Sequence, residues 1–398
     1  MTLKNSDELE PGNEVKEDIF NRDGSLLVSR GTIINYEITS KLKKHDINFG
    51  AAVEEAASSI QSTPLIEEEK MQTSIRAVQN VFESVMQRDV GGVKANIPED
   101  QLALVGEVIA DLMAILMRSE DLLYTVTNLM ASDDYTYRHS VNVCILSIMT
   151  ANAMGYSDGE IRDIALGSLL HDIGKANVKY GLIQKPSPLT ESEKEEMMKH
   201  SEYGYELIKD IEIIPYSVKQ IVRFHHEKLD GSGYPLGLKK MEIPEYVRIV
   251  TLCDMFDAMT ANRSYRKRMP VHLALEVLMR DAVYKIDAGV YRKMTSTVCI
   301  FPPGQGVLLS DGRVGIVSAY RIHSPSRPKV KLIEFCLKTG QLEVTEINLE
   351  ACHTLFIVDT WDVADFNSFF TRIPEKEFFD PENVDVGTVI GLKQTNVS

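Results

Sequence analysis

Residues 223–235, RFHHEKLDGSGYP, place two adjacent histidines before an acidic turn that ends on Gly233-Tyr234-Pro235. On a helix, neighbouring side chains point about 100° apart, so His225 and His226 do not both belong to one core-facing stripe. For an isolated pair, one core histidine beside one incidental histidine would be the simpler interpretation. The pair is not isolated, because residues of the same chemistry recur on both sides of it.

Polar residues that can bind metal lie in or beside the apolar helical segments of the middle of the chain. The dyad His171-Asp172 follows IALGSLL, His139 precedes VNVCILSIM, and Asp254 lies within VRIVTLCDMFDAM. Buried imidazoles and carboxylates are costly unless they are paired or bind metal. A helical bundle can project such ligands inward from several helices to form a dimetal site. The sequence therefore predicts a metal site built from His139, His171, Asp172, His200, His225, His226 and Asp254.

The number of these side chains indicates two divalent metal ions. If Asp172 bridges, they supply about eight of the roughly twelve bonds that two octahedral ions need. The remaining positions suit one bridging hydroxide and two phosphate oxygens. Adjacent rings on His225 and His226 could then reach one ion from different directions. Nitrogen and carboxylate ligands at this coordination number favour iron or manganese over tetrahedral zinc.

Composition and charge narrow the class of protein. The chain has 398 residues, of which 44% are hydrophobic, and this length allows roughly two or three domains. The net charge of −15 argues against long nucleic acid and anionic membranes as partners. The N-terminus does not resemble a signal peptide, and charged residues interrupt the best membrane candidate, Leu102–Met117. The 5 cysteines lack CxxC spacing and are expected to be reduced, buried thiols of a cytoplasmic protein.

Hydrophobic periodicity and turn signals predict a mainly α protein with a β-rich C-terminal part. Residues 1–62 are expected to form a small α+β N-terminal regulatory domain, residues 63–111 a helical linker, and residues 112–298 the main helical domain, with helical patterning to about residue 288. Residues 299–398 are expected to form a β-rich extension and a polar tail. Three hairpin turns are predicted, at Asn21-Arg22-Asp23-Gly24, Ser310-Asp311-Gly312 and Lys338-Thr339-Gly340.

Two motifs together resemble one protein family. The sequence His171-Asp172-Ile173-Gly174-Lys175, combined with residues 225–235, resembles the HD-GYP branch of the HD phosphohydrolases. The His-Asp dyad alone would indicate only the superfamily, whereas His200, the paired histidines and the Gly-Tyr-Pro turn narrow it. The resemblance implies a helical HD-domain bundle over residues 112–298. It also implies hydrolysis of the 3′-5′ phosphodiester of cyclic di-GMP, a bacterial second messenger.

The resemblance further assigns roles to individual side chains. The metal ligands would divide into two sets that share Asp172, with His139, His171 and Asp254 in one set and His200, His225 and His226 in the other. A hydroxide between the metals would attack phosphorus in line and expel the ribose 3′ oxygen. Lys175 would stabilise charge on the phosphoryl oxygens. Asp172 and Lys175 are therefore the expected catalytic residues.

Substrate contacts are expected downstream of the metal ligands. The segment 262–266, NRSYR, resembles a DRPYR-like segment that contacts phosphate in the family, which favours Arg263 and Arg266 as substrate-binding residues. Asn262 and Ser264 replace the usual aspartate and proline. The alternative for these arginines is that they complement a helix dipole at its C-terminal end.

The Gly-Tyr-Pro turn has two interpretations. Tyr234 either contacts the substrate or a partner, or only completes a tight turn in which Gly231 and Gly233 adopt positive φ. The resemblance suggests a diguanylate cyclase (GGDEF) domain as the partner that this turn would contact. The oligomeric state is left open, a homodimer included.

The leading hypothesis is a metal-dependent cyclic di-GMP phosphodiesterase, and three alternatives stand beside it. One is a catalytically weak member that binds a cyclic dinucleotide or a partner protein. Another is a phosphodiesterase for a different cyclic dinucleotide, and the third is an HD nucleotidase. The complete ligand set counts against the first alternative and the Gly-Tyr-Pro turn against the third. The final product, pGpG or GMP, and the signal read by residues 1–62 stay open.

The sequence also predicts the number of metals. Some members of the family carry a glutamate four residues before the histidine that matches His139, where it binds a third ion. This position is Tyr135 here, and a neutral phenol with a pKa of about 10 is a poor ligand. Two metal ions are therefore expected.

Overall fold

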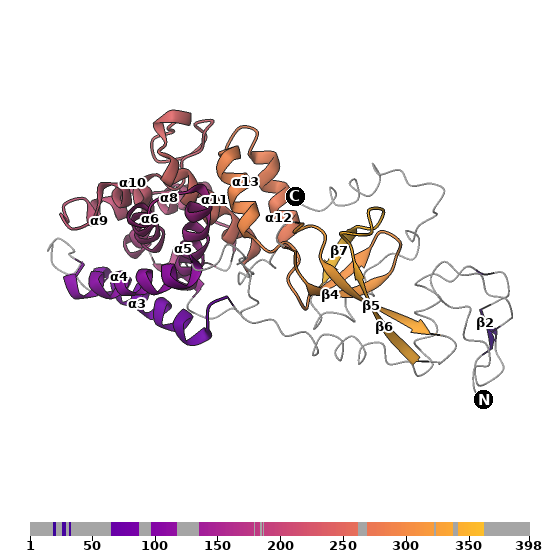
Figure 1. The fold of residues 1–398 in the computed structure, drawn as a ribbon. Coiled ribbons are helices and arrows are strands. Elements are labelled where there is room, and N and C mark those ends of the chain that lie inside the picture. The colour runs from indigo at the N-terminus through magenta and orange to yellow at the C-terminus, as the bar shows by residue number, and fades with distance from the viewer. Residues whose placement is uncertain are drawn as a thin grey trace. The chain divides into compact units, whose positions relative to one another are not determined.

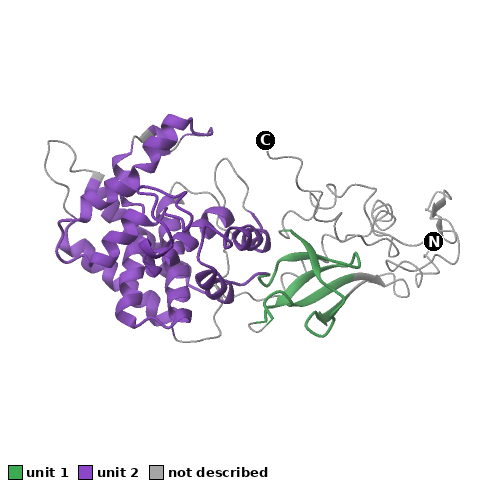
Figure 2. Ribbon diagram, turned by 90° about the horizontal axis from the view of Figure 1, so that it is seen from above, with its two compact units in different colours: residues 1–62, 301–398 green, residues 63–300 purple. Residues whose placement is uncertain are grey.

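The chain divides into two compact units in its computed structural model. One unit contains residues 63–300, and the other contains residues 1–62 and 301–398 (Figure 2). The structure describes residues 19–20, 26–28, 32, 65–86, 97–117, 135–178, 180–183, 185, 187–261, 269–321, 324–336 and 341–361. Within these ranges, no helix has the length and apolar character that a membrane span requires.

The larger unit is a bundle of helices, in agreement with the predicted mainly α fold (Figure 1). In chain order its elements are α3 (Glu68–Met86), α4 (Glu99–Leu116), α5 (Tyr135–Met154), α6 (Asp158–Leu170), η1 (Ile173–Asn177), α7 (Tyr180–Ile183), α8 (Glu191–Met198), α9 (His200–Ile208), α10 (Tyr216–Phe224), η2 (Lys240–Glu242), α11 (Glu245–Thr260), α12 (Val271–Asp281) and α13 (Ala288–Thr297).

Helical structure continues past residue 288, where the sequence pattern was expected to fade. The side chain of Asp287 caps α13 by accepting hydrogen bonds from the backbone N–H groups of Gly289 and Val290. Val290 and Met294 are buried one turn apart, so the helix has a short core-facing stripe. The cap and this stripe explain why the helix forms in a segment of low average hydrophobicity.

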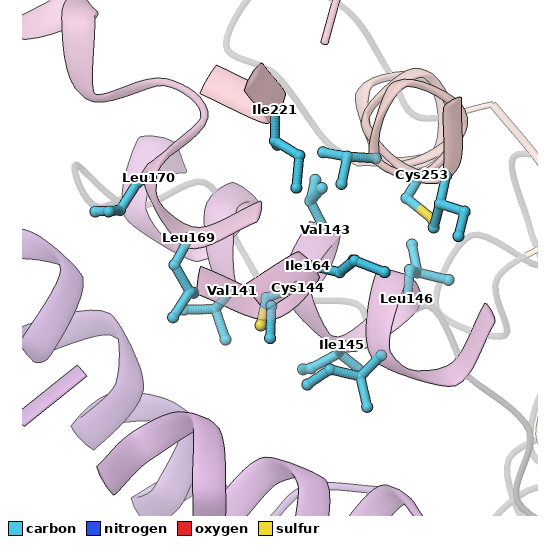
Figure 3. Packing of buried hydrophobic residues seen from close by; sticks show 14 of the residues in the cluster. Val141, Val143, Cys144, Ile145, Leu146, Ile164, Leu169, Leu170, Ile221 and Cys253 are labelled. Atoms are coloured by element: carbon cyan, nitrogen blue, oxygen red, sulfur yellow. The ribbon is translucent and has the colours of Figure 1, made fainter. Parts of the chain in front are cut away.

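Helix α5 lies at the centre of the bundle and packs against α3, α4, α6, α11 and α13. Its run VNVCILSIM is apolar on nearly every side, which suits a helix surrounded by other helices. Figure 3 shows Val141, Cys144 and Leu146 from α5 beside Ile164 of α6 and Cys253 of α11. This central position brings the start of α5, where His139 lies, close to α11.

Two glycines allow η1 to lie against α9. A Cβ atom on Gly174 would lie 1.9 Å from the carbonyl oxygen of His200 and 2.3 Å from the backbone nitrogen of Gly204. Such distances are far shorter than any van der Waals contact, so only glycine fits at position 174. This close approach places the His171-Asp172 dyad, just before η1, next to His200.

The β-rich part forms a five-stranded antiparallel sheet of order β6-β5-β4-β3-β7. Its strands are β3 (Gly306–Leu309), β4 (Val314–Ala319), β5 (Lys329–Cys336), β6 (Gln341–Asn348) and β7 (Ile357–Trp361). The pairing of β3 with β4 and of β5 with β6 confirms the two predicted C-terminal hairpins. Near the N-terminus, β1 (Ile19–Phe20) pairs with β2 (Leu26–Val28) across the predicted turn, and most of the predicted α+β N-terminal domain lies outside the described residues.

The cysteines agree with the expectation of reduced thiols, with one correction. Cys144, Cys253 and Cys299 are buried, and Cys144 and Cys253 are free thiols. Cys352 is also free but only half-buried, so the prediction that it is buried was wrong. It lies in the turn after β6, where its backbone groups bond to Leu349 and Leu355 and its side chain is left partly exposed. The side chain of Cys336 lies outside the described part of the chain.

Candidate metal centre

The structure brings all the predicted metal ligands together, from helices α5, α9 and α11 and from the residues that directly follow α6 and α10. They form two groups in which the candidate ligand atoms all lie within 4.8 Å of one another. The first group is His139, His171 and Asp254, and the second is Asp172, His200, His225 and His226. All are buried except His226, whose side chain is 26% exposed. His226 is therefore the candidate ligand that solvent reaches most easily.

The two oxygens of Asp172 face different groups. Its Oδ2 atom lies 3.3 Å from His171 Nε2 and 4.0 Å from His139 Nε2. Its Oδ1 atom lies 3.4 Å from His200 Nε2. A carboxylate placed in this way can share its oxygens between two cations, which is the arrangement of a dimetal site.

The ring nitrogens of the second group are arranged in a way that fits a bound cation. The Nδ1 atoms of His200 and His225 lie 2.7 Å and 3.0 Å from the carbonyl oxygens of Met197 and Val222. Because a carbonyl only accepts, each Nδ1 carries the proton and each Nε2 presents a lone pair. Nevertheless His200 Nε2 lies 3.2 Å from His225 Nε2 and 3.1 Å from His226 Nε2. The lone pairs of His200 and His225 therefore face each other with no proton between them, and the ring of His226 lies beside them.

His171 gives a second sign that the site fits a metal. Its Nδ1 lies 2.7 Å from the carbonyl oxygen of Ser168, so Nε2 presents the lone pair here as well. That Nε2 atom is buried without a hydrogen-bond donor and faces Asp172 Oδ2 at 3.3 Å, so two acceptor atoms lie opposite each other. Leaving such a group unpaired costs about 1–3 kcal/mol. Imidazole and carboxylate donors in these numbers fit divalent transition metals, and the absence of thiolates from both groups sets the site apart from structural zinc sites.

The charge states of the residues also suit metal binding, which needs neutral imidazoles and ionised carboxylates. Burial lowers the pKa of His200 to about 4 and that of His226 to about 3. Burial and the charge of His226 hold the pKa of His225 well below its usual range. Burial alone would raise the pKa of Asp172, but the charges of His171 and Lys175 hold it well below its usual range.

His139 differs from the other histidines in its electrostatic surroundings. Burial alone would lower its pKa, but hydrogen bonds to Asp254 and Asp257 raise the pKa to about 9. The position between these two carboxylates therefore stabilises a positive charge. A divalent cation beside His139 Nε2 supplies such a charge in place of a proton.

Lys175 lies beside the shared carboxylate. Its Nζ donates to Asp172 Oδ2 at 2.5 Å, and its side chain is 26% exposed. It therefore reaches the metal centre from a side that water can approach. This position is compatible with a contact to a phosphoryl oxygen.

The Gly-Tyr-Pro turn folds back onto the histidine pair. The backbone N–H of Tyr234 donates to the carbonyl oxygen of His226, and the Tyr234 ring lies 4.6 Å from the His226 ring at an interplanar angle of 31°. Gly231 has a positive φ of 81°, as predicted, but Gly233 does not. A Cβ on Gly233 would lie 2.5 Å from Glu227 Cα and from the His226 carbonyl oxygen. Glycine is therefore required there for close packing, which corrects the predicted reason.

Glu227 holds this turn in place and was not foreseen from the sequence. It is 1% exposed, and its two carboxylate oxygens accept hydrogen bonds from the backbone N–H groups of Leu236 at 2.7 Å and Leu238 at 2.9 Å. The signal was available, because an acidic residue directly follows the histidine pair. The sequence does not show that it binds backbone groups 9 and 11 residues further along.

Replacing Glu227 with alanine is expected to destabilise the helical unit. Two N–H groups lose their acceptor, and each charge-assisted hydrogen bond contributes about 1.5–3 kcal/mol. We expect a loss of about 3 kcal/mol or more in the free energy of unfolding, measured by urea denaturation. Glu191→Ala is a suitable control, because Glu191 is exposed and pairs only across one helical turn with Lys194. Equal stability of both variants would show that Glu227 does not hold the turn.

Two predicted substrate residues cannot be placed. Arg263 and Arg266 lie outside the described residues. Tyr234, the third, lies beside His226 and 6.3 Å from the ring centroid of His200, so it borders the second ligand group. Asp257 is a further residue of the site that the sequence interpretation missed. It lies three positions after Asp254 on α11, a spacing that places both carboxylates on one helix face.

Comparison with known proteins agrees with this geometry. Residues 125–290 match the family model described as the HD domain, and residues 306–369 match the KOW domain associated with the HD domain. A cyclic di-GMP phosphodiesterase of Pseudomonas aeruginosa is 34% identical over 58% of this chain and 55% of its own length. A 3′3′-cGAMP-specific phosphodiesterase of Vibrio cholerae is 32% identical, over 43% of this chain and 37% of its own length. A cyclic di-GMP phosphodiesterase of Thermotoga maritima is 37% identical over 39% of this chain and 44% of its own length.

The chain spans about half the length, or less, of these curated relatives. The HD match covers every residue of the two ligand groups, the Gly-Tyr-Pro turn and Lys175. Residues 125–290 therefore match the HD domain over the whole stretch that holds both ligand groups.

Proposed function

We propose that this chain is a cyclic di-GMP phosphodiesterase with a dimetal centre. The observation that carries the proposal is the arrangement of two ligand groups around the shared carboxylate of Asp172. The printed names of the relatives from Pseudomonas aeruginosa and Thermotoga maritima support cyclic di-GMP as the substrate. The same ligand set supports iron or manganese as the metal, because all donors are nitrogen or carboxylate oxygen.

In this proposal His139, His171 and Asp254 hold one ion and His200, His225 and His226 hold the other, with Asp172 shared. When bound, two such ions lower the pKa of a water molecule and neutralise charge at a phosphodiester. The buried hydrogen bonds from the Nδ1 atoms of His171, His200 and His225 to backbone carbonyls fix the rings in one orientation.

Lys175 has a separate part in the proposed reaction. Its ammonium group lies beside Asp172 on a partly exposed side, where it adds positive charge next to the incoming phosphate. A donor fixed in place stabilises the charge that develops on the phosphoryl oxygens during attack. Tyr234 borders the exposed His226, and its ring offers a flat surface to a base or ribose of the substrate.

A second candidate substrate is 3′3′-cGAMP. It is favoured by the Vibrio cholerae relative, whose printed name specifies that dinucleotide. Both compounds carry the same 3′-5′ phosphodiester, so the metal centre does not separate them. Discrimination would come from contacts to the bases.

The experiment that tests the proposal is a turnover assay with the full chain loaded with Mn²⁺ or Fe²⁺. Cyclic di-GMP, 3′3′-cGAMP and cyclic di-AMP are each supplied at equal concentration, and products are separated by chromatography. We expect the highest kcat/KM for cyclic di-GMP, with pGpG or GMP as product. Preference for 3′3′-cGAMP would support the second candidate, and no hydrolysis of any of them by metal-loaded protein would contradict an enzymatic role.

The loop that carries the Gly-Tyr-Pro turn is also the proposed contact for a protein partner, a diguanylate cyclase (GGDEF) domain. Leu236 on this loop and Met241 in η2, which follows it, are 55% and 88% exposed, which supports a protein contact there. Loss of binding to a GGDEF domain in a Leu236→Ser, Met241→Ser variant would support the contact, and unchanged binding would contradict it. The buried free thiols of Cys144 and Cys253 support the further proposal of a cytoplasmic site of action.

Residues 1–62 are proposed to be a regulatory domain that the chemistry does not need. Every proposed metal ligand lies within the compact unit of residues 63–300. A truncated protein lacking residues 1–62 should therefore fold, bind its metals and retain kcat within about twofold, because no ligand is removed. Circular dichroism, metal content and turnover check this together. A truncated protein that keeps its metals but loses turnover would show that the deleted part contributes to the site.

A further inference from the structure

The ring of His139 lies between two carboxylates of the same helix. Its Nδ1 is 2.7 Å from Asp257 Oδ2, and its Nε2 is 3.1 Å from Asp254 Oδ1. Asp254 and Asp257 are three residues apart on α11, so both point from one face of that helix toward the start of α5. All three side chains are at least 89% buried.

The two aspartates contact different nitrogen atoms of His139 and therefore have different roles. Nδ1 and Nε2 lie on different edges of the imidazole ring, so Asp257 contacts the edge that faces away from His171 and Asp254. Asp254 belongs to the first ligand group, whereas Asp257 belongs to neither group among the described residues. Asp257 therefore acts on the site through His139.

The other histidines with a hydrogen-bonded Nδ1 use neutral partners. His171, His200 and His225 all place Nδ1 against backbone carbonyl oxygens. His226 Nδ1 is 3.7 Å from Asp254 Oδ2, which is beyond hydrogen-bond distance. Within the two ligand groups as described, His139 is thus the histidine whose Nδ1 contacts an ionised carboxylate at hydrogen-bond distance.

A carboxylate partner has two physical consequences for the ring. It accepts a hydrogen bond from Nδ1–H, which leaves the lone pair of Nε2 directed toward Asp254 and His171. Its full negative charge also makes Nε2 a stronger donor to a cation than a carbonyl partner would. These effects reach the first ligand group only, because Asp257 contacts His139 and none of the second group.

We propose that Asp257 is a positioning residue that strengthens cation binding by the group of His139, His171 and Asp254. The two ligand groups then differ in what sets their affinity for a cation. In the first group it is the carboxylate partner of His139, and in the second it is the backbone carbonyl partners of His200 and His225. The inference rests on the proposed metal centre, but not on the identity of the substrate.

The test uses Asp257→Asn in the full chain, because asparagine has the same shape and still offers an oxygen to Nδ1. The probe is Mn²⁺ alone, titrated into chelator-treated protein and followed by calorimetry. Removing such a partner typically weakens metal binding by about 10- to 100-fold. We expect that loss for one of two ions, with the affinity for the other unchanged.

Two further variants complete the design. Asp163→Asn is the matched control, because Asp163 is a helical aspartate that accepts a hydrogen bond from Ser217 at 2.5 Å and belongs to neither ligand group. It should leave both affinities unchanged. Asp257→Glu keeps the charge and should recover part of the lost affinity. If Asp257→Asn does not fold by circular dichroism, the same comparison is made between Asp257→Glu and wild type, with a smaller loss expected at one ion.

The outcomes distinguish this inference from the proposed function. If the wild-type protein binds two ions and Asp257→Asn binds both with unchanged affinity, the positioning role is contradicted while the metal centre stands. Equal weakening at both ions would also contradict it, because a general structural defect would have that effect. If the wild-type protein binds no Mn²⁺, the proposed metal centre itself fails.

Discussion

The double variant His171→Ala, Asp172→Ala is expected to lose its metal ions and all measurable hydrolysis of cyclic di-GMP. His171 contributes Nε2 to the first ligand group, and the two oxygens of Asp172 face both groups. Neither ion keeps its full set of ligands. Since enzymes accelerate their reactions by about 10⁶-fold or more, loss of the whole centre should reduce kcat to the background rate.

Elemental analysis and the turnover assay measure this variant directly. The expected result is less than one tenth of the wild-type metal content, an approximate limit for a site stripped of shared ligands, and no product above the rate in buffer. Asp163→Asn again serves as the control for an aspartate substitution in the same helical unit. A double variant that retains full activity would rule out the dimetal centre.

Lys175→Ala should keep the metals and lose rate. The lysine is not in either ligand group, and its Nζ contacts the shared carboxylate 2.5 Å from Asp172 Oδ2. Removing one donor that stabilises developing charge typically lowers kcat by on the order of 10²–10³-fold. KM should change much less, because the interaction strengthens as charge develops.

Lys185→Ala is the matched control for this lysine. Lys185 also pairs with a carboxylate at 2.5 Å, that of Glu193, and its side chain is 25% exposed against 26% for Lys175. It contacts neither ligand group, so kcat should be unchanged in this variant. Should Lys175→Ala also retain the wild-type kcat, Lys175 would be an ordinary ion-paired lysine.

The sequence predicted the parts of the site that depend on residue type and local pattern. Histidines and aspartates beside apolar runs marked the positions that meet in the two groups, because buried groups of this kind need a partner. The hairpins at residues 310–312 and 338–340 followed from turn residues between alternating strands. Such signals are contained within a few neighbouring residues.

The parts that the sequence did not predict depend on contacts between distant segments. Asp257 and His139 are 118 residues apart, and they meet because α5 packs against α11. Gly233 was assigned to a backbone conformation, but its need for glycine comes from packing against Glu227. The acceptor role of Glu227 depends in turn on how residues 230–239 fold back. No local pattern in the sequence predicts these contacts between distant residues.

Anomalous diffraction at the manganese edge, from crystals of the Mn²⁺-loaded protein, tests the central claim most directly. The account predicts two ions in each chain, one among His139, His171 and Asp254 and one among His200, His225 and His226, with Asp172 contacting both. Absence of an ion from either group would contradict the dimetal centre. A third fully occupied ion beside His139 would contradict the predicted number, and Asp133 or Asp134, which lie outside the described residues, would then be the ligand that the sequence interpretation misjudged.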